Sequence, residues 1–138
     1  MTSFLWFLAS MLLALVVIFG ASRNVTAEIP WHTAPQPTLQ ASRASGKPIL
    51  VFVTREGCPP CKKMKEQTWV DPMVSRVVSE NFESLFLHNS NHADVVKKMG
   101  IRFFPTTLIY SPGGKYVGQK TGYMEPMKAL QWMGSMRR

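Results

Sequence analysis

Residues 48–61 read PILVFVTREGCPPC, and this stretch decides the fold of the chain. Its first seven residues form an almost continuous apolar run, rich in β-branched side chains, that is too short for a helix. Such a run is typical of a strand buried on both faces, at the centre of an α/β sheet. Two cysteines separated by two prolines follow after a three-residue turn. We therefore predict a central strand that leads into a Cys-x-x-Cys pair at the start of a helix.

The segments on either side of this stretch alternate between helical and strand patterns. Pro59 and Pro60 fit the first turn of a helix, where a missing N–H costs least. Asp71 is a natural N-cap and Pro72 a natural first residue for the next helix. The expected helices are 39–45, 59–69, 72–81, 94–99 and 125–136, and the remaining expected strands are 84–88, 106–110 and 115–121. This order predicts an α/β fold with a small mixed sheet flanked by helices.

An apolar N-terminal segment precedes this domain. Residues 4–21, FLWFLASMLLALVVIFGA, contain no charge and are long enough for a membrane-spanning helix. Val25-Thr26-Ala27 offers the small residues of a cleavage site, whereas the lack of Lys or Arg before Phe4 favours an uncleaved anchor. Residues 1–27 are therefore either a signal peptide or a membrane anchor. With either one, we expect the domain to be exported.

Composition limits the architecture further. The 138 residues allow one domain, and 46% hydrophobic residues exclude a disordered chain. Residues 28–38 contain three prolines and no period, so they are expected to form an extended linker before a domain at 39–138. The net charge is +8, but the Lys and Arg residues are scattered, so we expect no nucleic-acid partner.

Cys58 and Cys61 are the first candidate functional residues. At i and i+3 on a first helical turn, their sulfurs lie within bonding reach. The helix N-terminus favours the Cys58 thiolate, as do Lys62, Lys63 and Lys65, so we expect its pKa to lie below the ordinary value near 8.5. Pro60 has no N–H to offer the sulfur, which leaves the N–H of Cys61, together with that of Lys62.

A structural zinc site is the alternative for two cysteines at this spacing. His88 and His92 would supply the second pair of ligands. However, 26 residues lie between Cys61 and His88, against about 12 in a compact zinc finger. We therefore interpret both histidines as ordinary surface residues and expect no metal.

Phe104, Pro105 and Thr106 form the second candidate constellation. A proline directly before a strand, in a chain with a Cys-x-x-Cys, favours a cis peptide bond that faces the cysteines. Such a bond would leave the backbone groups of Phe104 free to pair with an extended substrate. These three residues are therefore the expected substrate-binding site.

Taken together, these motifs resemble the thioredoxin superfamily over residues 31–136. The segments that carry this resemblance are Lys47–Val53, Cys58–Lys62 and Gly100–Thr106. Within the superfamily, Thr68–Val74 and Thr121–Met124 are similar to the C-terminal periplasmic domains of DsbD-type proteins. The resemblance implies Cys58 as the attacking thiol, Cys61 as the resolving thiol and Pro105 as the proline that faces the substrate.

Three positions depart from the pattern of the superfamily. Phe52 stands where many thioredoxins have a buried acid, Lys65 where DsbD-type domains have a second acid, and Gly57 where an aromatic residue often precedes the first cysteine. A buried carboxylate raises the pKa of nearby thiols. Its absence predicts a more acidic Cys58 and a redox couple less reducing than that of thioredoxin.

The resemblance and the residues together predict an exported thiol-disulfide oxidoreductase, expected to be a reductase of protein disulfides. No nicotinamide or flavin motif is present, so the redox-active disulfide Cys58–Cys61 is the only expected redox group, and a membrane partner is expected to donate the electrons. The alternative is a binding module of the same fold that holds unfolded proteins without redox turnover.

Overall fold

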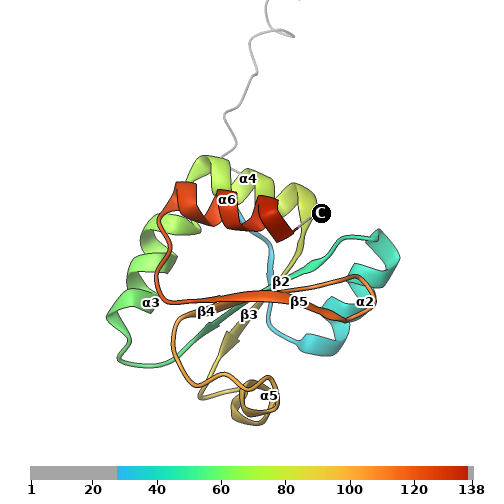
Figure 1. Cartoon of the computed structure of the whole chain (residues 1–138). Helices are drawn as coiled ribbons and strands as arrows, with labels where there is room; N and C mark the ends of the chain where they lie inside the picture. Colours follow the sequence, from blue (N-terminus) through green and yellow to red (C-terminus); the bar gives the residue numbers. More distant parts are fainter. Residues whose placement is uncertain (1–27, 137–138) are drawn as a thin grey trace, which may run out of the picture.

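The computed structural model describes residues 28–136, which form a five-stranded mixed sheet with helices on both faces (Figure 1). The strand order is β1-β3-β2-β4-β5. β1, β3 and β2 run parallel to one another, while β4 is antiparallel to both β2 and β5. The strands are β1 (Trp31–His32), β2 (Ile49–Thr54), β3 (Glu83–His88), β4 (Thr106–Tyr110) and β5 (Tyr116–Thr121).

The helices divide between the two faces of the sheet. α4 and α6 lie above it in Figure 1, α5 lies below it, and α3 lies at the left-hand end of the strands. Packing against the second core cluster places α2 on the same face as α5. The helical segments are α2 (Pro35–Ser45), α3 (Pro59–Lys63), the π-helical segment η1 (Met64–Thr68), α4 (Pro72–Asn81), α5 (Ala93–Lys98) and α6 (Pro126–Met136).

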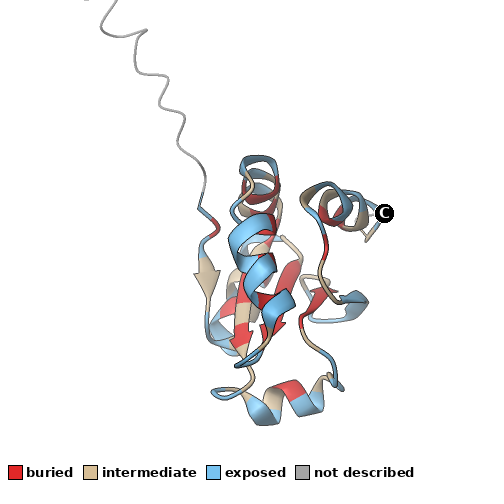
Figure 2. Ribbon diagram, turned by 90° about the vertical axis from the view of Figure 1, so that its left-hand side faces the viewer, coloured by how far each residue is buried: buried red, intermediate tan, exposed pale blue. Residues whose placement is uncertain are grey.

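β2 is the central strand that the apolar run predicts. All six of its residues are buried, and Figure 2 shows buried residues concentrated along the middle strands. Because side chains alternate along a strand, Leu50 and Phe52 enter one core while Ile49, Val51 and Val53 enter the other. Burial on both faces explains why the run is continuous rather than alternating.

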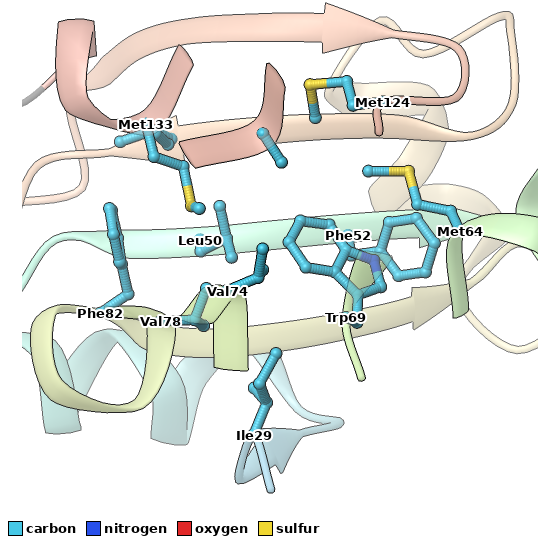
Figure 3. Packing of buried hydrophobic residues seen from close by; sticks show 12 residues of the cluster. Ile29, Leu50, Phe52, Met64, Trp69, Val74, Val78, Phe82, Met124 and Met133 are labelled. Atoms are coloured by element: carbon cyan, nitrogen blue, oxygen red, sulfur yellow. The ribbon is translucent and has the colours of Figure 1, made fainter. Parts of the chain in front are cut away.

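The larger core lies between the sheet and α4 and α6, and its packing is shown in Figure 3. Phe52 is fully buried there beside Trp69, and Met64 lies next to them. The smaller core faces α2 and α5. The fully or nearly fully buried members of the larger core include Leu50, Phe52, Met64, Val74, Val78, Phe82, Ala129 and Met133.

The expected caps hold the helices in place. The Asp71 carboxylate accepts hydrogen bonds from the backbone N–H groups of Met73 and Val74 at 3.0 and 3.1 Å, which confirms it as the N-cap of α4. α2 ends at Gly46, whose φ of 72° lies in the left-handed region that favours glycine.

The expected linker over 28–38 is wrong in part. Trp31 and His32 form a short strand on the free edge of β3, and α2 begins at Pro35, four residues before the expected start at Leu39. Pro35 and Pro37 occupy its first turn, where their missing N–H groups are tolerated. The helix expected over 59–69 also differs, because from Met64 to Thr68 its turns widen into a π-helix, with Trp69 N–H bonded to the Met64 carbonyl.

The N-terminal apolar helix expected within residues 1–27 lies outside the described residues. Within residues 28–136, none of the helices has the length and apolar character needed to cross a bilayer.

Candidate functional site

Cys58 and Cys61 lie where β2 passes into α3. The turn between them and β2 contains Gly57, whose φ of 62° is one that an aromatic side chain rarely adopts. Cys58 is the N-cap of α3, and the two cysteines form a disulfide with their Cα atoms 5.3 Å apart. Cys58 is partly exposed, whereas only 2% of Cys61 is exposed. Cys58 is therefore the more accessible residue of the pair, and Cys61 is covered.

One backbone N–H contacts the accessible sulfur. The N–H of Cys61 donates to Cys58 Sγ at 3.3 Å, as the sequence predicts for a first turn that contains Pro60. The N–H of Lys62 donates instead to the Cys58 carbonyl at 3.1 Å. The expected contribution of the Lys62 N–H to the sulfur is therefore wrong, because the first helical turn uses it.

The cysteines open into a cleft of about 410 Å³. Lys62 and Lys65 both line it, so two of the three lysines expected to influence Cys58 lie on this side of the helix, and the expectation for Lys63 is wrong. Lys63 points elsewhere, with its Nζ 4.4 Å from the centre of the Tyr123 ring. The complete lining is Arg55, Glu56, Gly57, Cys58, Pro59, Cys61, Lys62, Lys65 and His88.

His88 was not expected in this cleft. It ends β3, beside Thr54 of β2, and only 22% of its side chain is exposed. The ring is at the surface and hydrogen-bonded to Ser90, as the interpretation of a surface histidine requires, but the sequence did not reveal that strand pairing brings the end of β3 next to the turn before Cys58. Within residues 28–136, no group of three or more His, Cys, Asp or Glu side chains is placed to hold a metal ion.

The Phe104–Pro105 peptide bond is cis. Pro105 is buried and its carbonyl accepts from the Gly122 N–H at 2.8 Å, while neither backbone group of Phe104 has a hydrogen-bond partner within residues 28–136. Arg55, which lines the cysteine cleft, lies 5.6 Å from the centre of the Phe104 ring. Arg55 therefore connects the cleft with the proline loop, a relationship that no local sequence signal revealed.

Thr106 stabilises the proline loop through a hydrogen bond of its side chain. Its side chain is almost fully buried, and its hydroxyl donates to the Phe103 carbonyl at 2.7 Å. Phe103, by contrast, is 71% exposed. The exposed apolar surface of the loop thus comes from Phe103, a residue absent from the predicted site.

Aromatic side chains fill the position of the missing buried acid. Phe52 packs against Trp31, Trp69 and Phe86, with ring centres 5.3 to 6.1 Å apart. The cluster belongs to the larger core, in which Met64 of η1 is also buried. No carboxylate could be accommodated in this packing without losing its water.

Comparisons with known proteins agree with this geometry. A family model described as a thioredoxin-like domain matches residues 35–137. The chain is 28% identical over 102 residues to "Thiol:disulfide interchange protein DsbD" of Yersinia pestis (strain Pestoides F), an alignment that covers 69% of this chain and 17% of that protein. The chain thus spans about a sixth of the length of this curated relative.

Two solved structures show the same fold. A DsbH oxidoreductase superposes with a TM-score of 0.70 at 16% identity, covering 83% of this chain and 89% of that one. The C-terminal domain of Neisseria meningitidis DsbD in its oxidised form has a TM-score of 0.62 at 20% identity, covering 76% and 98%. The chain belongs to the thioredoxin-like family, and it carries the cysteine pair of a thiol-disulfide oxidoreductase.

Proposed function

We propose that this protein acts outside the cytoplasm as a reductase of protein disulfides. The observation that carries the proposal is the asymmetry of the pair, in which Cys58 is accessible and held by the Cys61 N–H while Cys61 is buried. Thiol-disulfide exchange requires one thiolate that a partner can reach and a second that acts only after the first has reacted.

In the reduced protein, the Cys58 thiolate attacks one sulfur of a substrate disulfide. The substrate S–S bond breaks, a Cys58–substrate disulfide forms, and one substrate thiolate leaves and takes a proton from water. Cys61 then loses its proton and attacks Cys58 Sγ. The mixed disulfide breaks, the second substrate thiolate leaves, and two electrons have passed from the cysteine pair to the substrate.

The proline loop provides the surface on which a substrate segment would lie. The unpaired backbone groups of Phe104 would form main-chain hydrogen bonds with an extended segment. The exposed Phe103 would contact its side chains, while the buried Pro105 and Thr106 would hold the loop in shape. Of the three predicted substrate-binding residues, Phe104 would thus bind the substrate directly, and the buried residues would support the loop.

The reductase direction requires a donor that restores the dithiol after each turnover. We propose a membrane partner, which is supported by the similarity to DsbD and by the apolar run at residues 4–21. Residues 1–27 would either be cleaved or anchor the domain. The N-terminal sequence of the mature protein distinguishes these cases, because cleavage after Ala27 would leave Glu28 first.

The test uses a disulfide-bonded protein such as insulin, with dithiothreitol as the electron source. The wild type should accelerate reduction, Cys58→Ser should abolish the acceleration, and Cys61→Ser should accumulate a mixed disulfide at Cys58. A wild-type protein that leaves the rate at the level of dithiothreitol alone contradicts the proposal.

A binding module is the second candidate, favoured by the 71% exposure of Phe103 beside the proline loop. Such a module would hold unfolded chains without exchanging disulfides. Cys58→Ser separates the two, since a binding module would still suppress the aggregation of an unfolded protein while the reductase would lose its activity.

A further inference from the structure

His88 shares the cleft of the cysteine pair although it comes from a different strand. It pairs with Thr54 in the parallel register of β2 and β3, and Thr54 precedes the turn that leads to Cys58. The last residue of β3 therefore lines the same cleft of about 410 Å³ as both cysteines.

Each nitrogen of the imidazole has a polar neighbour, a hydrogen-bonded hydroxyl on one side and a solvent-exposed carboxylate on the other. Its Nδ1 lies 2.7 Å from the Ser90 hydroxyl, and its Nε2 lies 3.6 Å from a carboxylate oxygen of Glu56. The backbone around it is also fixed, since the Asn89 N–H donates to the Thr54 carbonyl at 2.8 Å and the His92 N–H to the His88 carbonyl at 3.1 Å. The ring is thus part of the cleft wall.

The cleft contains few groups that exchange a proton at neutral pH. Arg55, Lys62 and Lys65 are its cations, and Glu56 is the acid among its lining residues. Unlike these four side chains, an imidazole such as that of His88 ordinarily changes its charge between pH 5 and 8. The position beneath the helix that could have held a buried acid is occupied by Phe52, which packs on Phe86.

Resolution of the mixed disulfide creates a need for such a group. Cys61 is 2% exposed, so its thiol has little contact with bulk water, and it must lose a proton before it attacks. A buried thiol without a nearby base or positive charge keeps its proton.

We propose that His88 exchanges protons with the cysteine pair and thereby replaces the missing carboxylate; this inference rests on the proposed disulfide exchange. Neutral His88 takes the proton of the Cys61 thiol, directly or through cleft water. The Cys61 thiolate attacks Cys58 Sγ, the Cys58–substrate bond breaks, and two electrons pass to the substrate sulfur. The imidazolium then gives its proton to that leaving thiolate, which restores neutral His88.

The experiment measures resolution of the mixed disulfide in single turnovers, from pH 5 to 9, by acid quench. In the wild type the rate should rise through the range in which imidazole loses its proton. His88→Gln should lose that inflection and, at pH 7, resolve at least about tenfold more slowly. Free imidazole should restore part of the rate to His88→Ala.

His92→Gln is the matched control. His92 lies four residues further along, its Nδ1 is 3.4 Å from the His88 carbonyl, and it does not line the cleft. This control should keep the wild-type pH profile. An equal loss in both variants, or a folded His88→Gln with the wild-type profile, overturns the proposal.

A wild type with no exchange activity would instead refute the proposed function, because the comparison of His88→Gln with His92→Gln requires a wild type that resolves the mixed disulfide.

Discussion

Phe52 and Trp69 pack edge to face in the larger core, with ring centres 5.3 Å apart and an angle of 66° between the rings. Phe52 is fully buried and comes from β2, the strand that leads to Cys58. Trp69 directly follows the π-helical segment η1. Aromatic rings therefore occupy the position at which other members of the superfamily have a buried acid.

Phe52→Asp should destabilise the protein strongly. The substitution removes a buried aromatic ring, which costs about 3 kcal/mol or more, and places a carboxyl group in an apolar site. Urea unfolding should show a lower midpoint for Phe52→Asp than for Phe52→Leu, which tests the loss of packing alone. Equal midpoints would mean that the site admits water and is not the apolar environment described here.

The two cysteines should react at very different rates once they are reduced. Cys58 is partly exposed and accepts the Cys61 N–H, whereas Cys61 is 2% exposed. Iodoacetamide at pH 7 should therefore modify Cys58 at least about tenfold faster than Cys61. Mass spectrometry of peptides after brief labelling measures the ratio, and comparable labelling of both would contradict the assigned roles.

Lys65 and Lys63 should differ in their effect on Cys58, although they are two residues apart. Lys65 lines the cysteine cleft, whereas Lys63 lies over the Tyr123 ring. A nearby cation favours the thiolate, so Lys65→Gln should raise the pKa of Cys58 by about half a unit at low salt. Lys63→Gln should change it less.

Ultraviolet absorbance of the thiolate, followed against pH in the reduced proteins, measures this difference. We expect a pKa of Cys58 below 8 in the wild type, because the Cys61 N–H, the start of the helix and the lysines act together. A value of 8 or above would show that these groups contribute little.

The sequence predicted the parts of the fold that follow from local patterns. The apolar run before Cys58 gave β2, Asp71 and Pro72 gave the start of α4, and the Cys-Pro-Pro-Cys motif placed Cys58 at a helix N-cap. Each of these depends on residues adjacent in the chain. The local periodicity and capping rules are therefore sufficient for them.

The features that the sequence missed depend on contacts between distant segments. The two-residue strand at Trp31 and His32 has no period of its own and forms because β3 offers an unpaired edge. His88 enters the cleft because β3 lies parallel to β2, a register that local patterns do not specify. The widening at η1 is associated with the burial of Thr68, whose hydroxyl donates to the Met124 carbonyl 56 residues away.

The reduction potential of the cysteine pair should be less negative than about −270 mV, the value typical of thioredoxin. Groups that stabilise the Cys58 thiolate favour the reduced form, and Phe52 supplies no buried carboxylate to oppose them. Equilibration with glutathione buffers, followed by mass analysis, measures the potential. A value near −120 mV would indicate an oxidant and contradict the proposed direction of electron flow.

Phe103 should affect protein substrates but not small ones. It is 71% exposed beside the cis proline, and the neighbouring Phe104 backbone is unpaired within residues 28–136, so an extended chain would bury the Phe103 ring when it binds. Phe103→Ser should raise the KM for a disulfide-bonded protein by about tenfold, since an apolar side chain buried on binding contributes roughly 1.5–3 kcal/mol. The rate with oxidised glutathione should not change, because that disulfide is too small to reach along the loop.

Met127→Ser is the matched control, since Met127 is 58% exposed but lies on α6 and outside the loop and the cysteine cleft. If the two variants have the same KM for the protein substrate, Phe103 is not part of the docking surface, and its exposure needs another explanation.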